Sequence, residues 1–363
     1  MIYLDHGATS FPKPASVRRA VGQAMKTCAN PGRGGHTAAM AAARTVYRCR
    51  DRAAELFDCQ PEQVVFTANC THGLNLAVEA LVRPGDRVVV SGFEHNAVMR
   101  PLYGKNAKIT VAGRKLFSWE NTLEEFKKAL RQGMDAAIFT HTSNVFGYIL
   151  PVEEMALLCR RYRVPFCVDA AQSAGVLPVS LTKWGADFVA MPGHKGLLGP
   201  QGTGLLLCAG ETKPLLRGGT GGDSINPDMP QTLPERLEAG TLNVPGIAGL
   251  EAGLALLQRE GAQRRFMKEQ SLGKRCAEEL EKLGMQVFSG PHQTGTVSFV
   301  PPADCEEVAE ILAKQGIAVR AGLHCAPLAH ETAGTLKTGT VRVSFGYDGD
   351  PCQIDRLIKA LKS

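Results

Sequence analysis

The sequence predicts an α/β fold with a mostly parallel sheet between helices, followed by a smaller α+β domain. Two patterns support this prediction. Between about residues 60 and 210, short and nearly continuous apolar runs alternate with helical patterns, as in strands that are covered on both faces. After about residue 245, two long helical patterns are followed by shorter strands.

The first part of the chain carries the predicted sheet. Strands are expected at six apolar runs, which are QVVFTA, DRVVVSG, DAAIFT, PFCVDA, ADFVAM and TGLLLC. Helices are expected at residues 37–57, 71–82, 121–132 and 152–163. Because strands and helices alternate along the chain, neighbouring strands are expected to run parallel with helical crossovers between them.

The second part of the chain is expected to form a separate α+β domain. Its predicted elements are two helices over 246–284, strands at 285–289, 295–300, 317–320 and 340–345, and helices at 304–315 and 351–362. The segment RGGTGGDSINPDMPQTLPERLEAGTLNVPG precedes it and is rich in Gly, Pro and polar residues. Because long irregular segments in compact chains are more often functional than passive, we expect this one to contribute to function.

Length and composition exclude several classes of protein. The 363 residues suffice for about two domains and a large buried core. No segment approaches the ~20 consecutive apolar residues of a membrane span. The start, MIYLDHGATS, lacks the basic and apolar regions of a signal peptide. We therefore expect a globular protein of the cytoplasm.

The net charge and the cysteine content also agree with a globular protein of the cytoplasm. The net charge of +6 is modest, and Arg44, Arg48 and Arg52 lie four residues apart, which is typical of a solvated helix face. Nucleic-acid binding is not predicted. The eleven cysteines show no CxxC pairs or regular spacing. Reduced core thiols are therefore expected rather than a disulfide framework or zinc sites.

Polar residues follow several of the predicted strands. In an open α/β sheet, ligands bind beyond the carboxyl ends of the strands. The sequence places Thr71 in NCTHGLN, His95 in FEHNAV, Asn144 in HTSNVFG and Asp169 in DAAQSAG at such positions. Thr71 and its helix N-terminus could hold a phosphate, or Thr71 or Asn69 could only cap the helix. Asp169 either meets a cation or hydrogen-bond donors, or caps the following turn.

Lys195 lies in GHKG, directly after the predicted strand FVAMP. The flanking glycines leave room for a bulky group. Burial would lower the pKa of the ammonium and make the amine a nucleophile toward a carbonyl; an exposed loop lysine is the alternative. A phosphate cradle, a ring-stacking histidine, an acid for a pyridinium nitrogen and a Schiff-base lysine are together the parts of a pyridoxal-phosphate site.

The sequence resembles the cysteine desulfurase and selenocysteine lyase family of the class V aminotransferase group, whose members are fold-type I pyridoxal-phosphate enzymes. The resemblance covers nearly the whole chain, in YLDHGATS, GRGGHTAA, EHNAV, HTSNVFG, VDAAQSAG, GHKGLLGPQGTG, EAGTLNVPG, RAGLHCAP and TVRVSFG. It implies a large pyridoxal-phosphate-binding domain at 16–245. Residues 1–15 and 246–363 would form the small domain that carries the catalytic cysteine loop.

The resemblance also implies which residues hold pyridoxal 5′-phosphate. Lys195 would form the Schiff base, Asp169 would pair with the pyridine nitrogen, and His95 would stack on the ring. Further cofactor contacts are implied for Cys70, Thr71, Asn144, Gln172, His194 and Thr241. Thr71 and His194 would bind the phosphate. Thr241 would reach the phosphate of the neighbouring subunit, which implies a homodimer.

Cys325 and Arg342 correspond to residues that define the family's reaction. Cys325 matches the sulfur-accepting cysteine, and Arg342 matches the arginine that binds the substrate carboxylate. The pocket of the substrate is further implied to include His36, Asn144, Arg320 and His324. The implied reaction converts L-cysteine to L-alanine, leaves a persulfide on Cys325 and passes the sulfur to an acceptor.

Several positions depart from the common family pattern. Pro192 stands where many relatives have Ser or Thr, and Cys70 replaces a hydroxyl residue. The segment 220–237 is shorter than in relatives that dock a separate sulfur-acceptor protein. The Cys325 loop is compact, as in the second desulfurase subgroup and in selenocysteine lyases, rather than long and Ser-rich. Whether a sulfur- or selenium-acceptor protein docks is therefore left open, and delivery by a swinging loop is not expected.

Three alternative functions remain open at the level of sequence. A selenocysteine lyase would use the same residues. An aminotransferase would share Lys195 and Asp169 but would not need Cys325, and a non-catalytic regulator that binds pyridoxal phosphate would not need the full catalytic set. For Cys325 itself, the alternatives are a core thiol or a zinc ligand together with His324 and His330.

Overall fold

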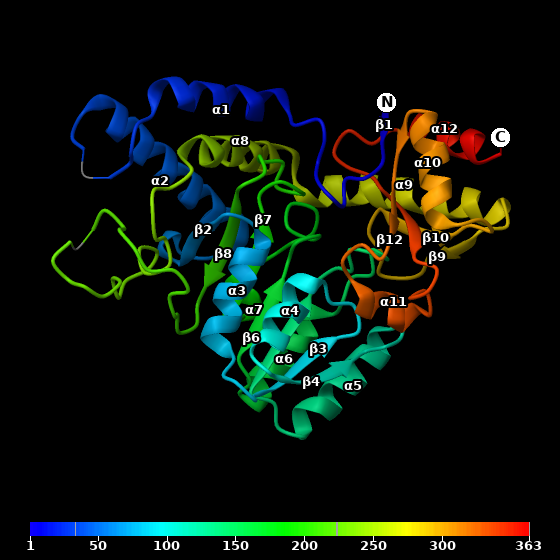
Figure 1. The fold of residues 1–363 in the computed structure, drawn as a ribbon, viewed down its shortest axis with the longest axis horizontal. Helices are drawn as coiled ribbons and strands as arrows, with labels where there is room; N and C mark the ends of the chain where they lie inside the picture. Colours follow the sequence, from blue (N-terminus) through cyan, green and yellow to red (C-terminus); the bar gives the residue numbers. More distant parts are fainter. Residues whose placement is uncertain (33, 223, 363) are drawn as a thin grey trace.

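The computed structural model describes residues 1–32, 34–222 and 224–362. They form a large α/β unit with a smaller α+β unit at one side, and both ends of the chain lie at the smaller unit (Figure 1). Among these residues, no helix combines the length and apolarity needed to cross a membrane.

A seven-stranded sheet forms the centre of the large unit, in the order β2-β8-β7-β6-β5-β3-β4. Its strands are β2 (Val64–Thr67), β3 (Arg87–Ser91), β4 (Lys108–Ala112), β5 (Ala136–Thr140), β6 (Phe166–Asp169), β7 (Phe188–Pro192) and β8 (Gly204–Cys208). Only β8 runs antiparallel to its neighbours. The predicted α/β fold with a mostly parallel sheet is confirmed.

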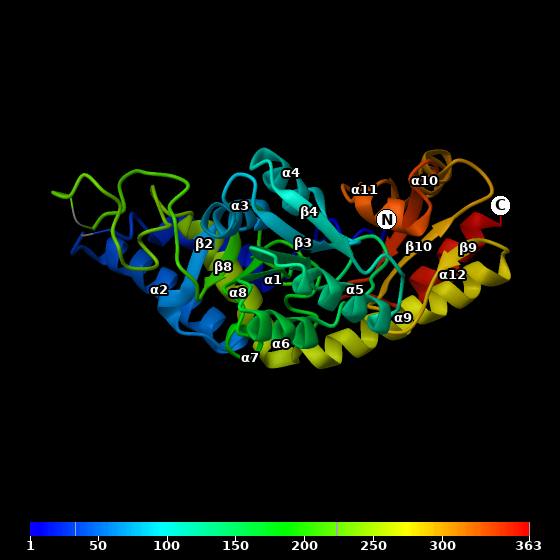
Figure 2. The ribbon, with the colours of Figure 1, turned by 90° about the horizontal axis from the view of Figure 1, so that it is seen from below.

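Helices cover both faces of this sheet (Figure 2). One face carries α3 (Cys70–Leu81) and α4 (Asn96–Gly104), and the other carries α2 (Thr37–Phe57), α5 (Trp119–Arg131), α6 (Val152–Tyr162) and α7 (Leu181–Trp184). Successive residues of one strand, Ile138 and Phe139, belong to two different apolar clusters. The strands are therefore apolar along their whole length because both faces are buried.

The sequence patterns missed the helices α4 and α7 and two further elements of the large unit. Helix α1 (Ala15–Thr27) buries only Val17 and Ala24 fully, so its apolar stripe is short. Strand β4 lies at the edge of the sheet and is mostly half-buried, so it lacks a continuous apolar run. Short or partial burial leaves a weak pattern in the sequence.

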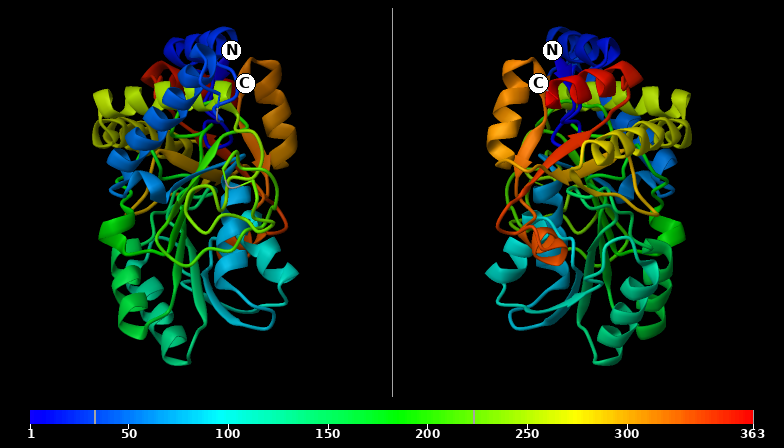
Figure 3. Two further views of the ribbon diagram at one scale, coloured as in Figure 1. Left: turned by 90° about the vertical axis from the view of Figure 1, so that its left-hand side faces the viewer. Right: turned by 90° about the vertical axis from the view of Figure 1, so that its right-hand side faces the viewer.

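The small unit is built on a four-stranded antiparallel sheet, in the order β12-β13-β10-β9 (Figure 3). Its strands are β9 (Gln286–Phe288), β10 (Thr296–Val300), β12 (Arg320–Gly322) and β13 (Thr340–Ser344), and its helices are α9 (Ala262–Lys282), α10 (Cys305–Lys314), α11 (Pro327–Ala333) and α12 (Pro351–Leu361). Strand β1 (Ile2–Tyr3) pairs in parallel with β11 (Ile317–Ala318). The start of the chain thus packs with the small unit.

Helix α8 (Val244–Glu260) joins the two units. The predicted division at residue 246 assigns it to the small domain, but its Leu250 and Leu254 belong to the apolar core of the large unit. Leu272 of α9 belongs to the core of the small unit. Because α8 packs against α1 and α2, the change from one core to the other comes at Gly261, between α8 and α9.

Candidate functional site

A cavity of about 240 Å³ lies at the carboxyl ends of the parallel strands. Polar residues from several strand ends and loops meet there, namely Asn69, Cys70, Thr71, His95, Asn144, Asp169, Gln172, His194 and Lys195. The structure thus brings together every predicted cofactor residue except Thr241. Pro192, the last residue of β7, also lines this cavity and offers it no hydroxyl.

Asp169 is the last residue of β6 and is 3% exposed. Its Oδ1 accepts hydrogen bonds from the backbone N–H of Ala171, at 2.9 Å, and from the thiol of Cys70, at 3.4 Å. Burial raises the pKa of Asp169, while these hydrogen bonds and the nearby Lys195 lower it. Asp169 therefore caps the following turn and also presents a carboxylate to the cavity.

Lys195 follows β7 in a turn and lines the same cavity. Burial lowers the pKa of its ammonium, and the charge of Asp169 opposes this shift. A lysine with a lowered pKa has a larger fraction of free amine near neutral pH, as attack on a carbonyl requires.

The N-terminus of α3 borders the same cavity through Thr71. Asn69 caps this helix, because its side chain accepts a hydrogen bond from the N–H of His72 at 2.9 Å. The capping role that the sequence left open thus belongs to Asn69. Thr71 adds a hydroxyl at the helix N-terminus, where anions are favoured.

The N-terminal segment of the chain is part of the site, although the sequence analysis gave its residues no role. Ala8 lines the cavity, and Gln172 donates a hydrogen bond from Nε2 to the carbonyl of Gly7 at 3.0 Å. His194 Nδ1 lies 3.0 Å from Oγ1 of Thr9. The only available signal was the family-like motif YLDHGATS, to which the sequence analysis assigned no residue role.

Two cations hold the backbone on either side of Lys195. The ammonium of Lys13 donates to the carbonyl of His194 at 2.7 Å, and Arg265 Nη1 of α9 donates to the carbonyl of Gly196 at 2.7 Å. Arg265 is itself buried and pairs with Glu269 at 2.7 Å. Residues from outside the large unit therefore fix the turn that carries the lysine.

Cys325 lies outside this cavity, on the loop between β12 and α11. Its side chain is exposed and borders a second cleft of about 510 Å³, which His95 also lines. Arg320 Nη2 lies 3.9 Å from its Sγ. His95 thus connects the cleft of Cys325 to the cavity of Lys195.

The backbone of the Cys325 loop is fixed at consecutive residues. His324 and Cys325 have φ values of +49° and +58°, which L-residues rarely adopt. The carbonyl of His324 accepts from Nδ2 of Asn144, and that of Cys325 accepts from the N–H of Asn96, each at 2.8 Å. The thiol is consequently held at one place rather than carried on a long arm.

Of the predicted substrate residues, Asn144 lines the cavity, whereas His36, Arg320, His324 and Arg342 line neither the cavity nor the cleft. His36 caps α2 by accepting a hydrogen bond from the N–H of Ala39 at Nδ1. His324 is buried, its Nε2 lies 3.1 Å from the carbonyl of Thr340, and burial lowers its pKa to about 2. His324 therefore anchors the cysteine loop. Among the described residues, no group of three His, Cys, Asp or Glu is arranged to bind a metal ion.

Arg342 lies behind the cavity wall on β13, with its side chain 1% exposed. Nη2 pairs with Oδ1 of Asp5 at 2.5 Å, and Nη1 donates to the carbonyl of Asn144 at 2.9 Å. Because Asn144 lines the cavity, Arg342 is one residue away from it. The sequence analysis did not find Asp5, the counter-ion of this buried cation.

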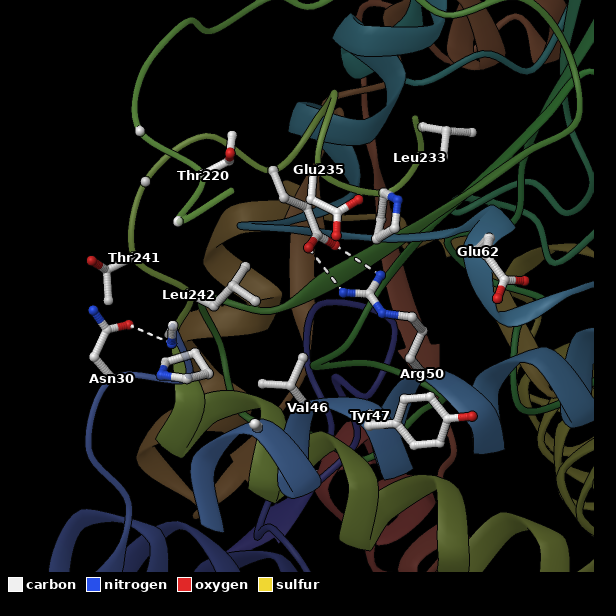
Figure 4. A pocket seen from close by; sticks show the side chains of 18 of the residues that line it. Asn30, Val46, Tyr47, Arg50, Glu62, Thr220, Leu233, Glu235, Thr241 and Leu242 are labelled. Atoms are coloured by element: carbon white, nitrogen blue, oxygen red, sulfur yellow. Dashed lines mark hydrogen bonds and ion pairs between the residues drawn. The ribbon is translucent and has the colours of Figure 1, made fainter. Parts of the chain in front are cut away.

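Thr241 lies in a separate pocket of about 740 Å³ with Asn30 and Thr220 (Figure 4). The irregular segment between β8 and α8 forms one wall of this pocket. Two other lining residues, Arg50 of α2 and Glu238, form an ion pair at 2.9 Å. Thr241 is therefore not part of the cavity that holds Lys195 of the same chain.

The residues of the 240 Å³ cavity fit pyridoxal phosphate by their chemistry. Lys195 offers an amine to an aldehyde, Asp169 a carboxylate to a ring nitrogen, and Thr71 a hydroxyl at a helix N-terminus to a phosphate. His95 offers an aromatic ring, and its pKa is lowered to about 4, mainly by burial. A neutral ring suits stacking on a cofactor.

Comparison with known proteins agrees with this geometry. Residues 2–357 match the family model described as Aminotransferase class-V. A probable cysteine desulfurase of Methanothermobacter thermautotrophicus is 33% identical over 99% of this chain and 94% of its own length. One of Pyrococcus abyssi is 34% identical, over 100% and 96%.

Solved structures of similar proteins have the same fold. The apo structure of a cysteine desulfurase from Thermococcus onnurineus NA1 has a TM-score of 0.91 and 32% identity, and the alignment covers 99% of this chain and 94% of that chain. The cysteine desulfurase CsdA from Escherichia coli has a TM-score of 0.86 and 26% identity, over 99% and 93%.

Proposed function

The chain belongs to the class-V aminotransferase family, and on this premise we propose that it is a pyridoxal-phosphate-dependent cysteine desulfurase. It converts L-cysteine to L-alanine and retains the sulfur as a persulfide on Cys325. One observation carries the proposal: an exposed thiol, Cys325, shares a cleft with His95, which also lines the cavity of Lys195 and Asp169. An aminotransferase would not need such a thiol.

The cofactor residues each have one task. Pyridoxal phosphate, when bound, supplies an electron sink for bond changes at the substrate Cα. Asp169 would hold its ring nitrogen protonated, and Thr71 and His194 would bind its phosphate. Lys195 Nζ would accept the proton from the substrate Cα, which its lowered pKa permits near neutral pH.

Cys325 performs the sulfur transfer. Its thiolate attacks the substrate sulfur, a sulfur–sulfur bond forms, and the bond between that sulfur and the substrate carbon breaks. The carbon takes up a proton and leaves as L-alanine. The guanidinium of Arg320 lies 3.9 Å from Sγ, where Nη2 can donate a hydrogen bond to the sulfur. Arg342 would orient the substrate carboxylate from behind Asn144.

We further infer a homodimer in which Thr241 serves the partner's cofactor. The position of Thr241 in a pocket apart from the cavity of its own chain supports this role (Figure 4). L-cysteine is favoured over L-selenocysteine because the relatives described above are named cysteine desulfurases. The persulfide sulfur passes to an acceptor, and we expect the enzyme to act in the cytoplasm.

A pair of cysteine variants tests the proposal. Cys325→Ala should abolish alanine formation from L-cysteine and the mass increase of a persulfide. Cys352→Ala removes the other exposed cysteine, on α12, and should change neither. Undiminished alanine formation by Cys325→Ala would contradict the proposed mechanism.

The same assay with L-selenocysteine tests the choice of substrate. Persistent alanine formation from L-selenocysteine but not from L-cysteine in Cys325→Ala would favour a lyase in which this thiol is needed only for sulfur. The visible absorption of the protein tests the cofactor. We expect an absorption band of the bound aldehyde that Lys195→Ala alters.

A further inference from the structure

The cleft at Cys325 extends well beyond the reacting groups. It runs between α3 and α4, which pack side by side (Figure 1). Cys325 and His95 line one end, and Glu79 and Lys105 line the other. Its volume of about 510 Å³ falls in the range of small-molecule sites. The proposed reaction uses only the end at His95.

The fixed backbone of Cys325 decides where its sulfur can be collected. The loop is anchored to Asn96 and Asn144, and His324 is anchored to Thr340 of β13. A persulfide on Cys325 is therefore not carried away by a mobile arm. The acceptor therefore has to come to Cys325, and the open cleft that Cys325 borders offers it a route.

The cleft carries an excess of positive charge. Arg100 of α4 lines it, is exposed, and forms no ion pair within the described part of the chain. Lys105, which lines the cleft, shares the carboxylate of Glu79 with Lys213, which lies outside the lining. Arg320 adds a further cation beside the thiol. An anion that enters the cleft is therefore attracted along its length.

The electrostatics at His95 agree with this charge distribution. After burial, the groups that lower the pKa of His95 are cations, and they include Arg100 of the cleft and Arg320 beside Cys325. Charge from the lining of the cleft and from beside Cys325 thus acts at the point where the cleft meets the cavity.

We propose that this cleft binds a small thiol that carries a carboxylate, and that this thiol removes the sulfur from Cys325. The inference rests on the proposed function, since it requires a persulfide on Cys325. The thiolate of the incoming molecule attacks the outer sulfur of the persulfide. A new sulfur–sulfur bond forms, the bond to Sγ breaks, and Cys325 leaves as a thiolate, so no external oxidant or reductant is needed.

The experiment separates loading from discharge. Holoenzyme is first treated with L-cysteine, freed of small molecules, and checked by mass spectrometry for the persulfide on Cys325. The loaded protein is then mixed with 3-mercaptopropionate, 2-mercaptoethanol or cysteamine, which carry a negative, neutral and positive group. Loss of the persulfide is followed over time, and each rate is divided by the thiolate fraction because thiol pKa values differ.

We expect the anionic thiol to discharge Cys325 about tenfold faster per thiolate than the neutral thiol, and the cationic thiol to be slowest. In Arg100→Glu the advantage of the anionic thiol should fall to about twofold or less. Lys128→Glu makes the same charge change at an exposed position of α5, outside the cleft, and should keep the advantage.

Two results would overturn the inference. One is equal discharge by the three thiols, which would point to an acceptor protein instead. The other is an equal loss of the anionic advantage in Arg100→Glu and Lys128→Glu, which would reflect net charge alone. If no persulfide forms on Cys325 in the first step, the proposed function itself is wrong, so the two failures are distinguishable.

Discussion

Lys195 lies on a turn enclosed by both units of the molecule, whereas Cys325 lies on a loop at the surface. The carbonyls beside Lys195 are held by Lys13 and Arg265, and burial lowers the pKa of its amine. Cys325 is exposed, and only its backbone is fixed. A buried amine can exchange protons with a bound substrate without water, while an exposed thiol can meet an acceptor from solution.

The largest expected difference between the two loops concerns their glycines. A Cβ at Gly196 would lie 2.1 Å from the carbonyl oxygen of Ala174. This oxygen belongs to the backbone, so it cannot move away by a change of side-chain rotamer. We expect Gly196→Ala to lower the free energy of unfolding by about 3 kcal/mol or more. Chemical denaturation of the soluble variant, or its failure to accumulate as folded protein, is the measurement.

Gly322, which precedes the cysteine loop, is the matched position. Its φ of +94° strains any other residue, but the nearest atom to a Cβ is a flexible carboxylate oxygen at 3.8 Å. Gly322→Ala should therefore cost only the backbone strain, about 1–2 kcal/mol. Equal losses for the two variants would contradict the contrast between the loops.

A second prediction concerns the clamp on the lysine turn. Arg265→Met leaves Glu269 buried without its partner, so the free energy of unfolding should fall by about 3–5 kcal/mol. The double variant Arg265→Met, Glu269→Leu should recover most of this loss. It still lacks the donor to the Gly196 carbonyl, and we expect it to release pyridoxal phosphate faster in a dialysis assay.

The exposed pair Arg275 and Asp355 provides the control, because its side chains are 43% and 58% exposed. Arg275→Met should change stability by less than about 1 kcal/mol. A double variant of the buried pair that is as unstable as Arg265→Met would show that the buried charge is not the cause.

A third prediction uses pH to probe the anchor of the cysteine loop. Burial lowers the pKa of His324 to about 2, against about 6.5 in the unfolded chain. The unfolded chain therefore binds the extra proton first, and this histidine's contribution to stability is complete above pH 6.5 and falls as the pH drops toward 2.

The His324→Gln variant should lack this dependence. Between pH 6 and 4, its free energy of unfolding should fall less steeply than that of the wild type, by up to about 1.4 kcal/mol per pH unit. Urea titrations of both proteins at each pH give the two slopes. Parallel slopes would mean that His324 is as accessible to protons in the folded protein as in the unfolded chain.

The smallest expected effect concerns a single hydrogen bond of that anchor. Thr340→Val removes the hydroxyl that lies 3.2 Å from Nε2 of His324 but keeps the carbonyl at 3.1 Å. We expect a loss of about 0.5–1.5 kcal/mol in stability and a modest rise in the rate at which a neutral reagent alkylates Cys325. An unchanged alkylation rate would show that the backbone contacts alone hold the loop.

The prediction of the fold from the sequence was confirmed, and the predicted strand-end residues lie around one cavity, for a common reason. A buried parallel strand leaves a continuous apolar run, and the residue after it lies at the carboxyl edge of the sheet. Asp169, His95 and Lys195 could therefore be grouped before any contact was known. Strand β4 was not predicted, because an edge strand is only partly buried and lacks a continuous apolar run.

Residues that act from a distance in sequence could not be grouped in this way. Asp5 meets Arg342, and Arg265 meets Gly196, only through packing of the small unit against the large one. His36 and His324 illustrate the converse, because each lies in a family-like motif but is engaged in capping or anchoring rather than in lining the cavity.

The sequence by itself determined the α/β architecture and the set of strand-end residues, because local burial and chain order dictate both. The tertiary structure alone decided that Lys195 is enclosed and Cys325 exposed. It also decided that His95 joins their two sites and that the cleft between α3 and α4 is positively charged. These properties depend on distances between elements that are remote in sequence, and such distances are set only when the two cores pack.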